Sequence, residues 1–241
     1  MKPYFHLVDG AQVPKDGALA QLLVQWVQRG CAIDLYSALP KTMHLLGPVL
    51  CQLDADQLKT FHQVIGRDPR SWSYFISTLQ PQTGFDFERC AEHLRQHALT
   101  VQAKDGLYYY LRFADTRILD LLPRVMNARQ WSVFSQSWQQ CVFMDRQGQL
   151  QCLDAKSVTP MEEGDGLLWN DAQIARLLDL TWPDALLNEV HKLRPAWRDQ
   201  HTLAQQHAIA KHTYQDAVAQ GKGEDIAWQI RACLNSLKVA T

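Results

Sequence analysis

The chain has 241 residues, of which 46% are hydrophobic and 20% are charged, and its 24 basic and 25 acidic residues leave a formal net charge of −1. This length, about one and a half typical domains, predicts one large domain or two unequal lobes that bury a core without disulfides. The composition excludes a disordered or fibrous chain. The even charge balance, without a block of basic residues, argues against a nucleic-acid partner.

The sequence gives no signal for export or for insertion into a membrane. Residues 1–6 lack the apolar run of a signal peptide, and no window approaches the ~18 uninterrupted apolar residues of a membrane span. The six cysteines contain no C-x-x-C pair and are interpreted as reduced, mostly buried side chains. We therefore expect a cytoplasmic protein with no membrane partner.

Strand and helix signals alternate through the first half of the chain. Alternating residues predict a strand over 4–8, and apolar residues at helical spacing from Leu19 to Val27 predict a helix that ends before Gly30. The elements expected next are strands over 32–36 and 47–53, a helix over 55–65 capped by Asp54, a strand over 72–76, and a helix after Asp86.

A hairpin is the clearest signal in the middle of the chain, with its turn at Lys104-Asp105-Gly106. A two-residue loop and a three-residue loop place opposite sets of side chains on one face. The three-residue loop, with Gly106 in the left-handed conformation, aligns Val101 with Tyr109 and gathers the apolar residues together. It is the predicted loop, because register follows the buried face.

Two short helices and a second hairpin are expected to complete the first lobe. Asp115 is predicted to cap a helix that Pro123 ends. Asn127 and Gln130 have the spacing of a capping box for one more helix. The second hairpin is predicted to pair residues 140–145 with 149–153 around the turn at Gln147-Gly148.

The predicted domains are an α/β lobe over residues 1–154, a connector over 155–166 and a helical lobe over 167–241. The first is an α/β (α+β) lobe with a mixed or antiparallel sheet and flanking helices, and the second is all-helical, with three to four helices. Pro183 is expected in an early helix position. The segment 195–220 has few large apolar residues, which predicts a helix that is partly exposed or completed by a partner.

The motifs of the common enzyme classes are absent from the sequence. His93 and His97 have the i, i+4 spacing that allows two imidazoles to meet one metal, but the H-E-x-x-H motif and a third ligand are missing. There is neither a G-x-S-x-G motif nor a Gly-rich phosphate loop. No catalytic residue, metal site or cofactor is therefore assigned. The 25 glutamines are an uncharged polar surplus that would suit a recognition surface.

The densest group of polar and aromatic residues lies between Leu111 and Leu119, where a strand leads into a helix. Asp115 is placed to accept the free amides of the first helical turn and to pair with one of two arginines, Arg112 or Arg117. This interpretation, a structural corner, competes with a binding role for the same side chains.

At these residues the chain resembles the adaptor-chaperone family of the bacterial type VI secretion system, the Tap or Tec proteins. The family's motif is Arg-Phe-Tyr-Asp-Pro-Arg followed by Val or Ile and Leu, and the chain departs from it at Ala114 and Thr116. The residues that match this motif and the family's other elements are Arg112, Phe113, Asp115, Arg117, Ile118, Leu119, His93-Leu94-Arg95, Arg70-Ser71-Trp72, Leu7-Val8-Asp9-Gly10, Leu35-Tyr36 and Gly47-Pro48-Val49-Leu50.

The resemblance implies a non-enzymatic protein that binds a specific effector, through a region near the effector's N-terminus, and loads it onto the VgrG spike. The residues that it marks as partner-binding or structural are Arg112, Phe113, Asp115, Arg117, His93 and Arg95. Two alternatives stay open. One is a small hydrolase with a site around Asp115, Arg112, Arg117 and His93, and the other is an immunity-type or regulatory protein that binds a toxin.

Overall fold

The computed structural model describes residues 4–65, 75–102, 108–155 and 168–236. The chain forms two compact units, an α/β unit of residues 1–174 and a helical unit of residues 175–241. The predicted fold class is therefore confirmed: an antiparallel sheet with flanking helices, followed by a helical region. The predicted connector, apart from Ala155, lies outside the described residues.

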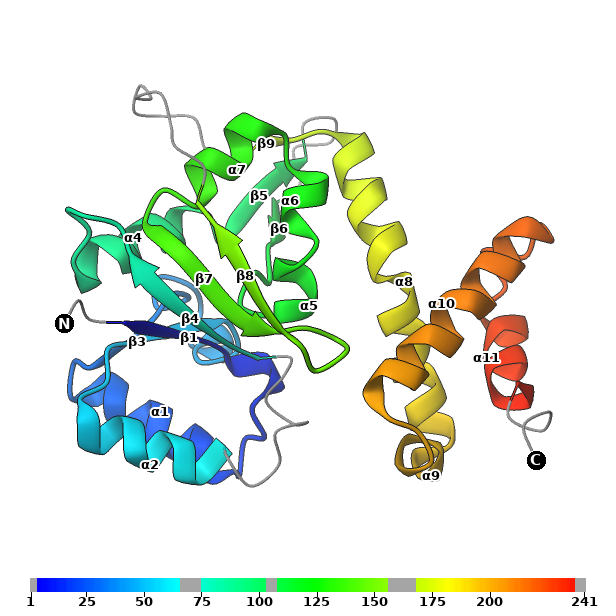
Figure 1. Ribbon diagram of the computed structural model, residues 1–241, viewed down its shortest axis with the longest axis horizontal. Coiled ribbons are helices and arrows are strands. Elements are labelled where there is room, and N and C mark those ends of the chain that lie inside the picture. Colours follow the sequence, from blue (N-terminus) through cyan, green and yellow to red (C-terminus); the bar gives the residue numbers. More distant parts are fainter. Residues whose placement is uncertain (1–3, 66–74, 103–107, 156–167, 237–241) are drawn as a thin grey trace. The chain divides into compact units, whose positions relative to one another are not determined.

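A six-stranded antiparallel sheet organises the α/β unit, with the strand order β2-β3-β1-β4-β7-β8 (Figure 1). Its strands are β1 (Phe5–Asp9), β2 (Ala32–Asp34), β3 (Pro48–Cys51), β4 (Ile76–Pro81), β7 (Trp138–Met144) and β8 (Leu150–Asp154). A second sheet has three strands, β6 (Tyr108–Tyr110), β5 (Leu99–Gln102) and β9 (Leu168–Trp169), and β9 runs parallel to β5. The sequence signals did not predict β9, because two residues are too few for a period-2 pattern.

Helices cover both faces of the large sheet. The helices α1 (Ala18–Gln28) and α2 (Ala55–Ile65) lie together on one face, and α4 (Phe87–Gln96) lies on the other (Figure 1). The alternation along β1 shows the two faces: the ring of Phe5 lies 5.4 Å from that of Phe87 in α4, and the ring of His6 lies 5.6 Å from that of Phe61 in α2. Because strand side chains alternate, Asp9 shares the face of Phe5.

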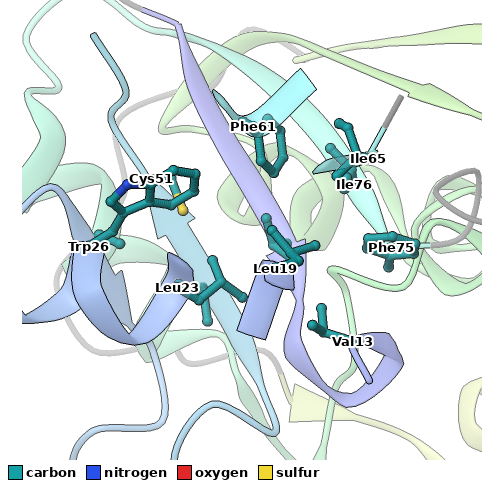
Figure 2. Close-up of a cluster of buried hydrophobic side chains, with 12 residues drawn as sticks. Val13, Leu19, Leu23, Trp26, Cys51, Phe61, Ile65, Phe75 and Ile76 are labelled. Atoms are coloured by element: carbon teal, nitrogen blue, oxygen red, sulfur yellow. The ribbon is translucent and has the colours of Figure 1, made fainter. Parts of the chain in front are cut away.

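The core beneath α1 and α2 is a cluster of buried apolar side chains from both helices and from the four strands β1 to β4 (Figure 2). Trp26 of α1 meets Phe61 of α2 edge to face, with 5.9 Å between the ring centroids. Leu23 projects from α1 toward the sheet, and Val13 closes the cluster from the turn after β1. Burying each such side chain contributes about 1.5–3 kcal/mol, so this face holds α1 and the turn firmly in place.

The unit also contains short helical elements, and aromatic residues around the last of them form a second packed group. These elements are the 3-10 turns η1 (Gly10–Gln12) and η2 (Lys41–Met43) and the helices α5 (Thr116–Leu119), α6 (Leu122–Val125) and α7 (Ala128–Phe134). Phe134 of α7 contacts the rings of Phe113, Trp131 and Trp138 at centroid distances of 5.5, 5.8 and 5.2 Å. The predicted capping box of Asn127 and Gln130 begins α7.

Two predicted boundaries in this unit are wrong. The strand predicted over 72–76 is β4, which starts at Ile76 and runs to Pro81, while residues 72–74 lie outside the described residues. Pro123 does not end a helix: α5 ends at Leu119, and Pro123 lies in the first turn of α6. Proline is well tolerated there, because the first amides of a helix have no intrahelical acceptor.

The predicted register of the first hairpin is also wrong. β5 pairs Thr100 with Tyr109, whereas the three-residue loop would align Val101 with Tyr109. The prediction assumed that the face of Tyr109 is buried. Tyr109 and Tyr110 are in fact both exposed, at 41% and 44%, so the face of Tyr109 is not the buried face that the prediction required. The loop residues 103–107 lie outside the described part of the chain.

The described residues of the helical unit form four helices. They are α8 (Asp171–Leu193), whose first turn belongs to the α/β unit, α9 (Pro195–Asp199), α10 (Leu203–Ala219) and α11 (Ile226–Asn235). Its core contains Leu186, Leu187, Val190, Trp197, Ala210 and Cys233. Pro183 lies in the middle of α8, not near a helix start as predicted. Pro183 is itself buried on the apolar face of the helix. This burial offsets the cost of the backbone hydrogen bond that is lost because proline has no N–H.

Several glutamines have structural roles in the described residues. Gln57, Gln130, Gln173 and Gln205 each complete a reciprocal cap at the start of a helix. Gln229 is fully buried, where it accepts from Trp182 Nε1 at 2.7 Å and donates to the Gly223 carbonyl at 2.7 Å. Part of the uncharged polar surplus is therefore used inside the fold.

Candidate functional site

The residues of the Arg-Phe-x-Asp-x-Arg stretch meet the end of the first strand in a group of four charges, of which the two carboxylates are buried. Arg112 donates from Nη2 to Asp9 Oδ2 at 2.6 Å and lies 3.5 Å from Asp115 Oδ2. Arg117 binds both oxygens of Asp115, with Nε donating at 2.9 Å and Nη2 at 2.7 Å. We call Asp9, Arg112, Asp115 and Arg117 the ionic cluster.

Local structure places each carboxylate of the ionic cluster. Asp9 ends β1 and accepts from the Ala11 amide at 3.2 Å, which starts η1. Asp115 is the N-cap of α5 and accepts from the Arg117 amide at 3.0 Å, as the sequence predicted. Both aspartates therefore hold a helical turn through a backbone amide and an arginine through the same side chain.

The backbone between the two arginines is anchored in the core. Phe113 and Ala114 are completely buried, and Thr116 is 1% exposed. The hydroxyl of Thr116 donates to the Met144 carbonyl at 3.2 Å, a bond that the usual proline of the motif cannot make. The two departures from the motif thus lie inside the fold and preserve the corner.

Two further polar residues complete the surroundings of the cluster. When the Gln12 amide is oriented with its oxygen toward the two guanidinium groups, the orientation that satisfies both of its polar atoms, it accepts from Arg112 Nη2 at 3.0 Å and from Arg117 Nη2 at 2.8 Å. Tyr36 lies against the ring of Tyr110, with 5.4 Å between the centroids. Burial, followed by the charge of Asp9, raises the pKa of the Tyr36 hydroxyl to about 12, so it stays protonated.

The charges of the ionic cluster cancel one another, and only one of its side chains is substantially exposed to solvent. Two aspartates and two arginines balance, and the side chains of Asp9 and Asp115 are each 2% exposed. Arg112 is 42% exposed and Arg117 14%. Burial raises the pKa of Asp9, an effect that the adjacent Arg112 opposes. The carboxylates are thus engaged by guanidinium groups, and Arg112 is the member that faces solvent.

His93 and Arg95 take part in other contacts. His93 Nε2 lies 3.2 Å from the Phe134 carbonyl, and its ring stacks edge to face with His97 at 4.6 Å. Arg95 pairs with Glu92 on the surface of α4. The predicted set of six site residues is therefore divided, with Arg112, Asp115 and Arg117 in the ionic cluster and Phe113 behind it in the core.

The histidine pair lies at the edge of the core, with His97 buried and His93 half-buried. His97 is 4% exposed, and burial, with a smaller contribution from His93, lowers its pKa to about 3. Burial also lowers the pKa of His93. Across the described residues, no three histidine, cysteine or acidic side chains are grouped to hold a metal ion. None of the helices in those same ranges has the length and apolar character needed to cross a membrane.

Asp9, Gln12 and Tyr36 belong to this site but were not assigned to it from the sequence. The Asp9-Gly10 pair reads locally as a turn after a strand, and Leu35-Tyr36 reads as the end of another strand. Both pairs do lie in elements that resemble those of the adaptor family. The order of these elements along the chain was therefore the one sequence signal that could have linked them to the site. Their meeting with Arg112 depends on the sheet, since Asp9 and Arg112 are 103 residues apart.

Comparison with known proteins gives a family for most of this unit. Residues 4–133, more than half of the chain, match the family described as "Domain of unknown function (DUF4123)". No curated protein and no solved structure shows a significant match. The matched range contains every member of the ionic cluster together with Gln12 and Tyr36. The chain therefore belongs to the DUF4123 family of domains of unknown function.

Proposed function

We propose that this protein is a non-enzymatic adaptor that binds one type VI secretion effector and loads it onto the VgrG spike. The observation that carries the proposal is the convergence of the family-like elements on one site. Asp9 of the first element pairs with Arg112 of the last, and Tyr36 lies beside them against Gly47. Elements far apart in the sequence thus support one another, as expected for a scaffold that displays a binding surface.

The ionic cluster gives less support to the hydrolase alternative. A general acid or base must have a side chain in reach of substrate. Asp115 is instead buried, and each of its carboxylate oxygens accepts a hydrogen bond from the Arg117 guanidinium group. His93 packs instead against Phe134 and His97. The proposal predicts no turnover. A hydrolytic activity that disappears in Asp115→Asn while the melting temperature is unchanged would favour the enzyme.

Affinity purification of the tagged full chain from its native cell tests the adaptor function. We expect mass spectrometry to identify both a VgrG protein and a type VI effector, and neither in an untagged strain. Recovery of neither from the tagged strain contradicts the proposal. The immunity-type alternative predicts a different pattern: the effector is recovered without the spike, and co-expression with this chain abolishes the effector's toxicity.

A further inference from the structure

A small cavity of about 210 Å³ opens beside the ionic cluster, between η1, α1 and the loop that follows η2. Its walls are mainly apolar and are formed by Val13, Ala20, Leu23, Val24, Leu45 and Leu46. Val13 and Leu23 also belong to the buried cluster in Figure 2, so the floor of the cavity is part of the core. Val24 is 39% exposed and lies at the accessible end. We call this cavity the η1 pocket.

One residue in the wall opposite α1, Leu45, has an unusual backbone conformation. Leu45 has a φ of 57°, which L-residues other than glycine seldom adopt, and its amide donates to Asp34 Oδ2 at 3.0 Å. Gly10 lies so close that an added Cβ would be 2.1 Å from the Leu45 carbonyl oxygen. Such strain persists only where the surroundings impose it, and it is frequent at ligand-binding sites.

The ionic cluster holds the turn η1, which forms another part of the wall of the η1 pocket. Gly10 lies between Asp9, which pairs with Arg112, and Gln12, which accepts from both arginines of the cluster. The turn η1 is therefore held at its two ends, through Asp9 and Gln12. This gives the Arg-Phe-x-Asp-x-Arg stretch a positioning role for the pocket wall.

The positive charge of Lys15 at the pocket favours a ligand that carries an acidic group next to the part that enters the pocket. Its polar lining residues are Lys15, Thr42 and His44, and none of its lining residues is acidic. Lys15 is exposed, and in the described ranges it has no carboxylate partner. A carboxylate next to the occupant would complement this lysine.

The size of the η1 pocket matches a single side chain. Sites for small-molecule ligands occupy about 300–1,000 Å³, more than the 210 Å³ available here. An apolar cavity of about 150 Å³ is sufficient to bind benzene. The space therefore suits one leucine or phenylalanine side chain, which is how an anchor residue of a partner enters a protein surface.

We propose that the η1 pocket receives one leucine or phenylalanine side chain of the partner polypeptide, with an aspartate or glutamate of the same segment next to Lys15. The inference relies on the proposed function only in taking the occupant from a protein partner. Buried anchors in such pockets contribute about 2 kcal/mol or more, so removal of the anchor weakens binding about 30-fold.

Capped tetrapeptides titrated into the isotope-labelled full chain test this inference by NMR. The probe is acetyl-Gly-Asp-Leu-Gly-amide, and its matched controls carry serine in place of leucine or asparagine in place of aspartate. We expect shifts at the lining residues, a loss of about 30-fold with the serine peptide, and a loss of about two- to five-fold with the asparagine peptide. Absence of binding, or shifts away from the pocket, overturns the inference.

Variants of the chain locate the interaction. Lys15→Gln is expected to remove the preference for the aspartate peptide, whereas Lys41→Gln, an exposed lysine of the same region outside the lining, retains it. Ala20→Phe fills the pocket and is expected to abolish binding. If Ala20→Phe does not fold, Val24→Trp obstructs the accessible end from an exposed position. Undiminished binding by the filled variant refutes the inference.

The two proposals fail in distinguishable ways. Recovery of spike and effector by the tagged chain, without peptide binding in the pocket, refutes the η1 pocket and leaves the adaptor function standing. Peptide binding in the pocket, without recovery of either protein, refutes the adaptor function and leaves the pocket standing.

Discussion

Replacing Asp115 tests whether the ionic cluster stabilises the corner between β6 and α5. The carboxylate is 2% exposed and accepts from the Arg117 amide, Nε and Nη2 at 3.0, 2.9 and 2.7 Å. Removing one partner of a buried pair costs about 3–5 kcal/mol, and the 14% exposure of Arg117 favours the lower end. Asparagine keeps the cap, which contributes about 1 kcal/mol. We expect a loss of about 3 kcal/mol for Asp115→Asn and about 4 kcal/mol for Asp115→Ala.

The assay is urea unfolding followed by tryptophan fluorescence and circular dichroism. The double variant Asp115→Asn with Arg117→Met is expected to lose less than the sum of the single variants, with a coupling of at least about 1 kcal/mol. Lys192→Ala is a matched control, because its pair with Glu189 is exposed and contributes about 0.5 kcal/mol or less. A loss below about 1 kcal/mol for Asp115→Asn, or additive single losses, would refute the cluster as a stabilising unit.

Three further perturbations separate steric, electrostatic and hydrogen-bonding contributions. Gly10→Ala places a Cβ 2.1 Å from the Leu45 carbonyl oxygen and is expected to lower stability by about 1–3 kcal/mol, measured by thermal unfolding; an unchanged melting temperature contradicts the close approach. His97 has a pKa of about 3 because of burial, below its value of 6.5 in the unfolded chain. Its contribution is therefore complete above pH 6.5 and is lost as the pH falls through this window, by about 2 kcal/mol at pH 5. The variant His97→Gln should show a correspondingly shallower loss between pH 7 and 5, and an identical pH dependence would argue against a neutral buried imidazole. Gln229→Ala leaves the Trp182 indole and two carbonyls without their partner, so we expect a loss of about 2–3 kcal/mol in urea unfolding; a loss under 0.5 kcal/mol would show that the amide is not a structural joint.

The local features were predictable because their physical causes lie within a few residues. The capping box at Asn127 and Gln130 and the cap at Asp115 need only a side chain and the next amides of the helix. Gly30 follows α1 with a φ of 74°, the left-handed conformation that commonly follows a helix C-terminus. Composition alone left several uses of the glutamines open, and the structure shows that some of them cap helices and that Gln229 is a buried joint.

The register of the first hairpin shows where local reasoning ended. The argument from a buried face holds where one side of a hairpin enters the core. Tyr109 and Tyr110 are both exposed, so the buried side chains that the argument assumed are not found at these two positions. Pro123 and Pro183 show a related effect, since each is compatible with a first helical turn but only the packing around Pro183 places it in mid-helix.

By itself, the sequence determined the fold class, the starts of α2, α4 and α7 and the strand-to-helix corner at Asp115, because propensity, periodicity and capping act over short distances. The tertiary structure decided that Asp9 and Arg112, 103 residues apart, share one ion pair. It also decided that η1, α1 and the loop at Leu45 enclose the η1 pocket. Both depend on strand order and on which face of β1 each side chain occupies, and these follow from packing the whole sheet against its helices.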